Sequence, residues 1–255
     1  MDFQLGLAGT ERYKSGCQIT RLVTERWAAL NLYCPACSSE RILQERPNTK
    51  AIDFTCGACS HTYQLKAARR WSETKIVDAG YGAMLAAIRS QTRPSLVVLH
   101  YTPKWLVKEL LLIPCFFLTE SVIQKRKPLS DQARRAGWVG CNILLEGIPP
   151  DGKLRLIQDG VENETSHVRR QFQLVKPLEE LNIAVRGWTL DVLRILRKLN
   201  KPTFNLKEVY EFEVQLASCH VHNRNIRPKI RQQLQILRDI GFIRFTKRGE
   251  YVFVH

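Results

Sequence analysis

Four cysteines in this sequence are spaced as metal ligands. They form two Cys-x-x-Cys pairs, Cys34 with Cys37 and Cys56 with Cys59, separated by 18 residues. The residues between the thiols of each pair are small or turn-forming, so the backbone can wrap around one ion, as in a four-thiolate zinc site. Because four thiolates complete the tetrahedral shell of zinc, we expect a structural zinc ion (Zn2+); a redox dithiol is the alternative.

A second group of polar residues flanks the second cysteine pair. Asp53 precedes the pair, and Gln64 and Lys66 follow it. Residues 51–55 and 61–67 carry β-branched and aromatic side chains in alternation, which predicts a hairpin whose turn is held by the metal. In such a hairpin Gln64 and Lys66 share one face, and Asp53 lies within about one or two cross-strand pairs of Gln64.

These residue types suit metal-dependent cleavage of a phosphodiester. Asp53 and Gln64 can offer oxygen ligands to a divalent cation, and Lys66 can orient or polarise the attacking water. The order resembles the PD-(D/E)xK nuclease motif, except that Gln64 replaces the second acid and Ile52 replaces the proline. Because an amide oxygen is a weak ligand for a hard cation, we name Glu25, on a predicted helix, as the candidate for the missing acid. A solvated strand face without catalytic function is the alternative.

Composition indicates a globular and strongly basic protein. Of 255 residues, 44% are hydrophobic and 25% are charged, and 39 Lys and Arg against 24 Asp and Glu give a net charge of +15. This charge favours a polyanion, above all nucleic acid, as the partner. The most apolar stretch, residues 105–118, is too short and too polar to span a bilayer, and the N-terminus lacks a secretory pattern. We therefore expect a cytoplasmic protein that binds no membrane.

The part of the chain around the candidate site is predicted to be a mixed α/β domain. Strands are expected at residues 96–101, 110–118 and 153–158, and a helix at residues 75–90 between them. The mixture of strands and helices along the chain indicates the α/β (α+β) class.

A basic segment, residues 124–142, contains five Lys and Arg, two glycines and one tryptophan. Cations of this kind can meet DNA phosphates, and the indole can offer a flat face to a base. A surface loop with a packed tryptophan is the alternative. The DNA-binding candidates in this segment are Arg126, Lys127, Arg134, Arg135, Trp138 and Asn142.

From Asn182 onward the pattern changes to that of a winged helix. Helices are expected at residues 188–199, 206–217 and 226–240, followed by two short strands joined by a basic turn. This segment contains 14 Lys and Arg against six Asp and Glu, so its third helix is the expected reader of a DNA groove; protein contacts are the alternative. The DNA-binding candidates here are Arg227, Lys229, Arg231, Gln232, Gln233, Gln235, Lys247 and Arg248.

Blocks of residues along the whole chain resemble the DpnI-type family of methyl-directed (type IIM) restriction endonucleases. Two long blocks are ARRAGWVGCN at residues 133–142 and KIRQQLQILRD at residues 229–239. The other blocks are residues 33–37, 53–56, 65–66, 124–129, 158–160 and 186–189. Together these blocks are far more specific than the three candidate catalytic residues alone.

The resemblance implies a PD-(D/E)xK catalytic domain with structural zinc over residues 1–181 and a winged helix over residues 182–255. It also implies that both domains bind double-stranded DNA at GATC sites carrying N6-methyladenine, and that the enzyme works in a bacterial cytoplasm. We expect a monomer, because no extended heptad pattern or large apolar patch is evident.

The resemblance also assigns functions to individual residues. Asp53 is expected to hold a catalytic magnesium ion (Mg2+), Lys66 to activate water, and the backbone carbonyl of Leu65 to complete the metal shell. Gln64 stands where the family has glutamate, and Trp138 is expected to pack against the adenine methyl group.

Two other functions compete with the endonuclease. A methyl-DNA-binding protein with a weak or inactive nuclease site is favoured by Gln64. An RNA-binding zinc protein is allowed by the charge but disfavoured by the winged helix.

Overall fold

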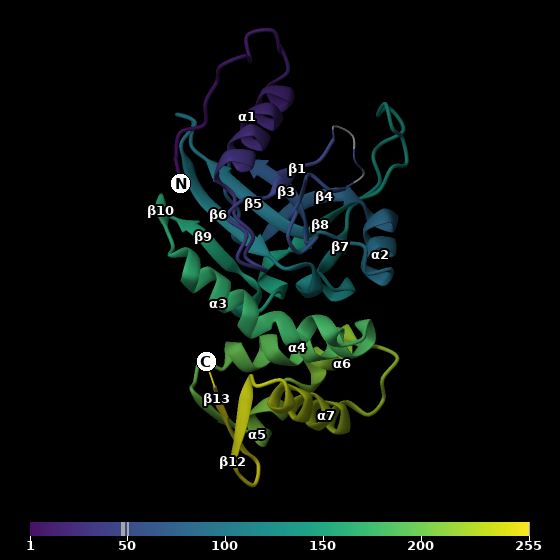
Figure 1. Cartoon of the computed structure of the whole chain (residues 1–255). Helices are drawn as coiled ribbons and strands as arrows, with labels where there is room; N and C mark the ends of the chain where they lie inside the picture. Colours follow the sequence, from purple (N-terminus) through teal and green to yellow (C-terminus); the bar gives the residue numbers. More distant parts are fainter. Residues whose placement is uncertain (47–48, 50, 255) are drawn as a thin grey trace. The chain divides into compact units, whose positions relative to one another are not determined.

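A computed structural model describes residues 1–46, 49 and 51–254, and the chain divides into two compact units (Figure 1). Unit 1 consists of Met1–Glu73, Ser90–Cys115 and Asp151–Val175. Unit 2 consists of Thr74–Arg89, Phe116–Pro150 and Lys176–His255. Unit 2 therefore combines two internal segments with the C-terminal segment, so compactness does not divide the chain at residue 181.

Unit 1 is built on a seven-stranded sheet in the order β1-β2-β3-β5-β6-β9-β10. Its neighbouring strands are antiparallel except for β3 and β5, which are parallel. The central strands β5 and β6 are almost continuously hydrophobic, as expected for strands buried on both faces. The strands are β1 Leu43–Gln44, β2 Phe54–Thr55, β3 Thr62–Ala68, β5 Ser95–Tyr101, β6 Val107–Ile113, β9 Leu154–Gln158 and β10 Val161–Glu162.

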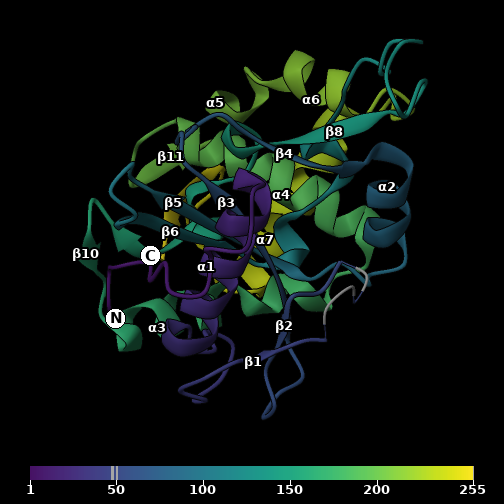
Figure 2. The same cartoon turned by 90° about the horizontal axis from the view of Figure 1, so that it is seen from above.

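Two helices pack on this sheet. Helix α1, Gly16–Asn31, contacts β1 and β3, and helix α3, Thr165–Val175, contacts β9 (Figures 1 and 2). Val23 and Trp27, one turn apart on α1, are buried, and Val168 and Phe172, one turn apart on α3, are fully buried. Helix α1 is thereby held against β3, the strand that carries Gln64 and Lys66.

The predicted strands of unit 1 are confirmed with changes at their ends. The strand expected at residues 110–118 ends at Ile113, because Pro114 cannot continue the ladder, and a 3-10 helix, η1 Cys115–Phe117, follows. In the strand expected at residues 51–55, only β2 pairs with β3. Ala51 has a φ of 62°, which interrupts the extended conformation before Asp53.

The helix predicted at residues 75–90 is wrong over its first half. Residues Lys75–Gly80 form strand β4, and only Tyr81–Arg89 form helix α2. Strand β4 pairs with β8 in a three-stranded antiparallel sheet, β4-β8-β7, and α2 lies beside it (Figure 2). The remaining elements of this part of unit 2 are η2 Glu120–Val122, β7 Ile123–Lys125, β8 Gly140–Leu144 and η3 Leu145–Gly147, and η4 Pro150–Gly152 follows them.

The C-terminal part of unit 2 has the predicted winged-helix arrangement, with two corrections. The expected second helix is broken into α5 and α6 at Glu211 and Phe212, and an unpredicted strand, β11, completes a sheet in the order β11-β13-β12. Asn205 starts α5 with a capping box that includes Glu208. The elements are η5 Lys176–Glu180, α4 Ile183–Lys198, β11 Thr203–Asn205, α5 Leu206–Tyr210, α6 Glu213–Cys219, α7 Ile226–Asp239, β12 Ile243–Lys247 and β13 Glu250–Phe253.

A buried carboxylate connects parts of unit 2. Asp191 on α4 is 3% exposed. Its Oδ2 lies 3.0 Å from Nε2 of His220, at the end of α6, and its Oδ1 accepts a 3.2 Å hydrogen bond from Ser121 in η2. The imidazole of His220 also stacks on the indole of Trp188, with ring centroids 3.6 Å apart. Asp191 therefore joins the helices of the winged helix to the segment that leads into β7.

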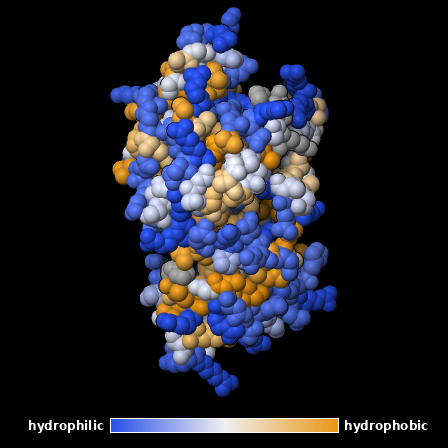
Figure 3. Space-filling view, viewed as in Figure 1, coloured by the Kyte–Doolittle hydropathy of each residue, from blue (hydrophilic) through white to orange (hydrophobic). Residues whose placement is uncertain are grey.

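On the face drawn in Figure 3, hydrophilic residues surround smaller hydrophobic areas, as expected for a chain with 25% charged residues. None of the helices in the described ranges is both long and apolar enough to cross a membrane.

Candidate functional site

The four predicted metal ligands lie together in unit 1. Their ligand atoms are all within 4.8 Å of one another, with 3.6 Å between Cys34 Sγ and Cys59 Sγ and 3.6 Å between Cys37 Sγ and Cys56 Sγ. The first pair follows α1, and the second forms the turn between β2 and β3. Their clustering confirms that these cysteines could hold one metal ion such as zinc.

The surroundings of the thiols also suit a metal. Burial raises the pKa of the Cys34 thiol, whose sulfur lies 3.0 Å from the hydroxyl of Tyr63. For Cys56 burial acts in the same direction, but hydrogen bonds from the backbone of Cys59 and Ala58 outweigh it and lower the pKa to about 6. A thiol that ionises readily beside three others is the ligand type that zinc selects, so this donor set fits the ion.

The hairpin between β2 and β3 sets the position of Asp53. Phe54 is opposite Tyr63 and the ladder between β2 and β3 ends there, so Asp53 directly precedes the paired residues, next to the strand that carries Gln64. The backbone N–H of Asp53 donates to the carbonyl of Tyr63, and Oδ2 of Asp53 accepts a 2.8 Å hydrogen bond from the backbone N–H of Leu65. The carboxylate is therefore held against the strand that carries Lys66.

Glu25 lies on α1 at the same end of the site. Its Oε1 forms a 2.6 Å ion pair with Arg21, and its Oε2 accepts a 3.2 Å hydrogen bond from Gln44. The hydrogen bond and the negative charge of Glu25 raise the pKa of Arg21, and the negative charge of Asp53 makes a smaller contribution in the same direction. Sequence reasoning did not identify Arg21, although its i,i+4 spacing from Glu25 was visible.

A pocket of about 340 Å³ lies between α1 and β3. It brings Glu25 together with Lys66 and Leu65, three of the predicted site residues. The full lining is Gly16, Cys17, Thr20, Arg21, Thr24, Glu25, Leu65, Lys66, Ala67 and Tyr101. The carboxylate of Glu25 on α1 thus lines the same pocket as Leu65 and Lys66 on β3.

Gln64 has a partner that the sequence did not indicate. The side chain is 8% exposed, and its Oε1 accepts a 3.3 Å hydrogen bond from Nη2 of Arg93, which is 7% exposed. A guanidinium at this distance competes with a cation for the same oxygen, so Gln64 does not fit as a magnesium ligand in this arrangement. Of the predicted magnesium ligands, Asp53 and the carbonyl of Leu65 therefore remain. Arg93 follows α2 in the chain, and no spacing rule connects it with Gln64.

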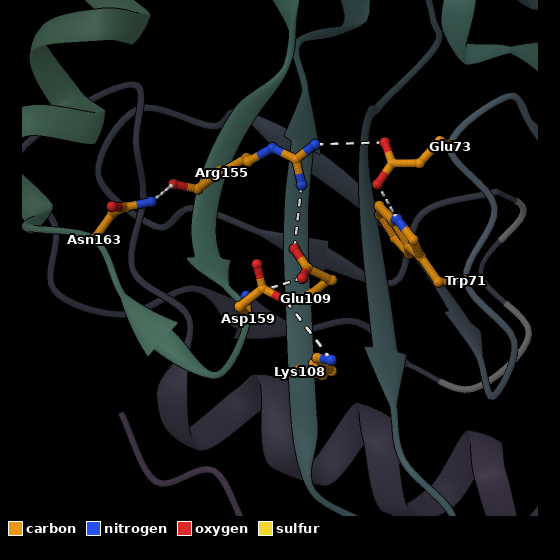
Figure 4. A network of polar contacts seen from close by, with 7 residues as sticks. All are labelled: Trp71, Glu73, Lys108, Glu109, Arg155, Asp159 and Asn163. Atoms are coloured by element: carbon orange, nitrogen blue, oxygen red, sulfur yellow. Dashed lines mark hydrogen bonds and ion pairs between the residues drawn. The ribbon is translucent and has the colours of Figure 1, made fainter.

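A separate polar network lies on the same sheet, outside the pocket (Figure 4). The carboxylate of Glu109, 6% exposed on β6, accepts hydrogen bonds from Arg155 and from the backbone N–H of Asp159. Arg155 also pairs with Glu73, which in turn accepts from the indole of Trp71. The network joins β6 to β9 and to the segment after β3, so these acids already have partners and are separate from the candidate site.

The basic segment of unit 2 consists of the end of β7, the loop that follows it and the start of β8. Arg126, Lys127, Arg134 and Arg135 are exposed. Trp138 is half-buried, with the Arg135 guanidinium 5.0 Å from its ring centroid. The indole lies against the backbone of β4 and β8: a Cβ added at Gly140 would come within 2.9 Å of it, so only glycine allows this close approach.

Asn142 does not fit the predicted DNA-contact set. It is 8% exposed, lies within β8, and donates a 2.9 Å hydrogen bond to Gln124 on the neighbouring strand β7. The side chain of Asn142 on β8 is turned away from solvent. The sequence did not indicate this, because the segment has the composition of a loop.

Most of the predicted candidates on α7 and the wing are at the surface. Gln233 is the exception: it is wholly buried, and its Oε1 accepts a 2.7 Å hydrogen bond from Thr189 on α4. The prediction for Gln233 is therefore wrong, because the residue belongs to the packed face of α7. Surface positions are occupied by Arg227, Arg231, Gln232, Gln235, Lys247 and Arg248, and Lys229 is half-buried.

These features define a class of protein: a mixed α/β domain with a four-cysteine cluster that could hold a metal ion, followed by a winged helix. A family model described as DpnI, Dam-replacing family, matches residues 1–181. A second model, described as the Dam-replacing HTH domain, matches residues 184–252. The chain therefore belongs to the DpnI (Dam-replacing) family, which indicates a restriction endonuclease that binds DNA through its C-terminal domain.

Proposed function

We propose that this protein is a methyl-directed, type II site-specific deoxyribonuclease. It cleaves double-stranded DNA at GATC sequences that carry N6-methyladenine, by metal-dependent phosphodiester hydrolysis in a PD-(D/E)xK-type site. The observation that carries the proposal is the family match together with the hairpin that places Asp53 beside the strand of Lys66. A protein with a net charge of +15 and a winged helix is suited to duplex DNA.

In this site the protein groups prepare the phosphodiester for attack. Asp53 and the carbonyl of Leu65 are the groups that would hold a magnesium ion, which when bound stabilises negative charge on the phosphoryl oxygens. Lys66 orients the attacking water, and its positive charge stabilises the negative charge that develops on the phosphoryl oxygens. Glu25 keeps Arg21 at the edge of the pocket, where the guanidinium can contact a phosphate.

Methylation is read by the loop of unit 2 and by the winged helix. We assign Trp138 the contact with the adenine methyl group, because its half-buried indole is fixed by Gly140 and Arg135. One methyl contact contributes on the order of 1 kcal/mol, or about tenfold in affinity. Strong discrimination therefore needs a second reader, and the exposed side chains Arg231 and Gln232 on α7 supply it.

Digestion of one plasmid, prepared with and without adenine methylation at GATC, tests this function. The reactions contain magnesium at a fixed low salt concentration, because phosphate contacts weaken steeply with salt. Only the methylated plasmid is expected to be cut, and Asp53→Ala should abolish cutting. Cleavage of both plasmids, or full cleavage by Asp53→Ala, contradicts the proposal.

A second function is favoured by the contact between Gln64 and Arg93. With its amide oxygen engaged, the site lacks a second carboxylate, and the protein could be a methyl-DNA-binding protein with a weak or inactive nuclease site. In that case wild type binds methylated DNA without cutting it, and Gln64→Glu is the variant that gains cleavage. The same plasmid assay therefore separates the two functions.

A further inference from the structure

The two halves of the cysteine cluster are positioned in different ways. The second pair, Cys56 and Cys59, forms the turn between β2 and β3, where the backbone N–H of Cys56 donates to the carbonyl of His61 at 2.9 Å. The first pair, Cys34 and Cys37, lies between α1 and β1, where the described residues 32–42 form neither helix nor strand. Such a segment loses conformational freedom when it closes around an ion, so an element that already holds it in place favours metal binding.

Helix α3 holds the first pair from about 130 positions later in the sequence. Arg169 donates from Nε to the carbonyl of Cys34 at 3.3 Å and from Nη2 to the carbonyl of Ser39 at 2.9 Å. The same Ser39 carbonyl accepts a hydrogen bond from the backbone N–H of Cys34. One turn further along α3, Gln173 donates to the carbonyl of Ala36 at 3.0 Å. Two side chains of one helix therefore bind the backbone of residues 34–40, which we call the first cysteine loop.

The same helix contacts the other half of the cluster. Phe172, between Arg169 and Gln173 on α3, is fully buried. Its ring centroid lies 5.5 Å from that of His61, which follows Cys59 by two positions. Helix α3 therefore touches both cysteine segments, and its docking fixes one relative to the other.

The guanidinium of Arg169 also places a positive charge beside the cluster. Zinc bound by four thiolates is a negatively charged centre, which a neighbouring cation stabilises. The guanidinium lies 5.2 Å from the ring centroid of Tyr33 and pairs with Glu40 at 2.9 Å. Because Glu40 is exposed, this ion pair contributes little. The contacts of Arg169 with the first cysteine loop and its charge are the interactions that a metal site can use.

We propose that α3 is a clamp for the metal site, with Arg169 and Gln173 as positioning residues. They hold the first cysteine loop in the conformation that brings Cys34 Sγ and Cys37 Sγ each within 3.6 Å of a sulfur of the second pair. Because these contacts require both a closed loop and a docked helix, metal binding and docking of α3 stabilise each other. This coupling does not depend on the proposed cleavage of DNA.

Competition for Zn2+ between the full-length protein and a chromophoric chelator measures the metal affinity directly. Loss of contacts that orient metal ligands costs about 10–100-fold in affinity, so Arg169→Met should weaken zinc binding at least about tenfold. Arg169→Lys, which keeps the charge but lacks the planar fork, should give an intermediate affinity.

Arg170→Met is the matched control for Arg169→Met. Arg170 is the exposed neighbour on α3, and no described residue pairs with its guanidinium. Its replacement should leave the zinc affinity unchanged. The inference is overturned if Arg169→Met folds and binds zinc as tightly as Arg170→Met does.

Gln173→Ala decides the question if Arg169→Met does not fold. Gln173 is exposed and alanine is favourable within a helix, so this variant should keep the fold. Loss of one hydrogen bond to the first cysteine loop should weaken zinc binding about threefold. A zinc affinity equal to that of wild type would show that the contact with Ala36 does not support the metal site, and would overturn the inference.

Hydrogen exchange with and without Zn2+ tests the reciprocal side of the coupling. Zinc should slow the exchange of the α3 amides in wild type and in Arg170→Met, and should slow it less in Gln173→Ala. Exchange of α3 that is independent of zinc in wild type overturns the inference, because a clamp requires that the two events be linked. Neither measurement involves cleavage, so the outcome is separable from that of the plasmid assay.

Discussion

Removal of the buried carboxylate of Asp191 should destabilise unit 2 more than any exposed charge change. The side chain is 3% exposed and engages His220 at 3.0 Å and Ser121 at 3.2 Å. Each hydrogen bond to a charged group is worth about 1.5–3 kcal/mol, and loss of one partner of a buried pair costs about 3–5 kcal/mol. We therefore expect Asp191→Ala to lower the free energy of unfolding by about 3 kcal/mol.

Equilibrium urea unfolding of the zinc-loaded protein, followed by tryptophan fluorescence, measures this change. Trp188 is a suitable reporter because its indole stacks directly on His220. With a slope of about 2–3 kcal/mol/M, the expected loss moves the midpoint of unfolding by about 1 M urea.

Asp239→Ala is the matched control for Asp191→Ala. Asp239 is an exposed acid of the same unit that pairs with Arg238 at 2.7 Å, and an exposed pair contributes about 0–1 kcal/mol. If the two variants shift the midpoint equally, the buried position of Asp191 does not matter and the reasoning is refuted.

Three further predictions follow from contacts described above. Removal of the metal from the four-cysteine cluster with a strong chelator should lower the melting temperature by calorimetry, and added zinc should restore it; an unchanged melting temperature excludes a structural metal. Gln232→Ala should weaken DNA binding in a fluorescence anisotropy titration without loss of stability. Gln233→Ala should instead lower the free energy of unfolding, measured by urea denaturation, by about 1 kcal/mol; the reverse pattern would contradict the exposure of these residues. The hydrogen bond from Arg89 holds the pKa of Glu120 below its ordinary value of 4.5, so this pair stabilises the fold above that pH and loses its effect as the pH falls through the lowered pKa. The difference in melting temperature between wild type and Arg89→Met should therefore shrink below about pH 4.5, and a constant difference would show that the pair does not act through charge.

Local patterns predicted the features that depend on neighbours in sequence. The cysteine cluster follows from the spacing of the two Cys-x-x-Cys pairs, and the hairpin around the second pair follows from alternation and turn chemistry within about fifteen residues. The helical face of α7 was equally visible, although Gln233 shows that a polar residue can belong to a packed face when a partner such as Thr189 satisfies it.

Features that depend on distant segments could not be predicted in this way. The segment of β4 was predicted as the start of the helix that follows it, and it forms a strand because β8, about 60 residues away in sequence, pairs with it. Arg93, 29 positions after Gln64 in the sequence, reaches it from a loop, and the segment between them contains a strand and a helix that belong to the other unit. Contacts between segments distant in sequence thus explain both why β4 was wrongly predicted as a helix and why Arg93 was not predicted beside Gln64.

The position of the cysteine turn has a consequence for how the sequence can change in length. Asp53 and Lys66 lie on opposite arms of one hairpin, and the Cys56–Cys59 turn fixes their register. A single insertion or deletion between Cys59 and Lys66 would turn the lysine to the opposite face of the sheet. The loop between β7 and β8, whose basic residues are exposed, has no such constraint along most of its length. Changes in length are therefore expected to be tolerated in the β7–β8 loop and excluded between Cys59 and Lys66.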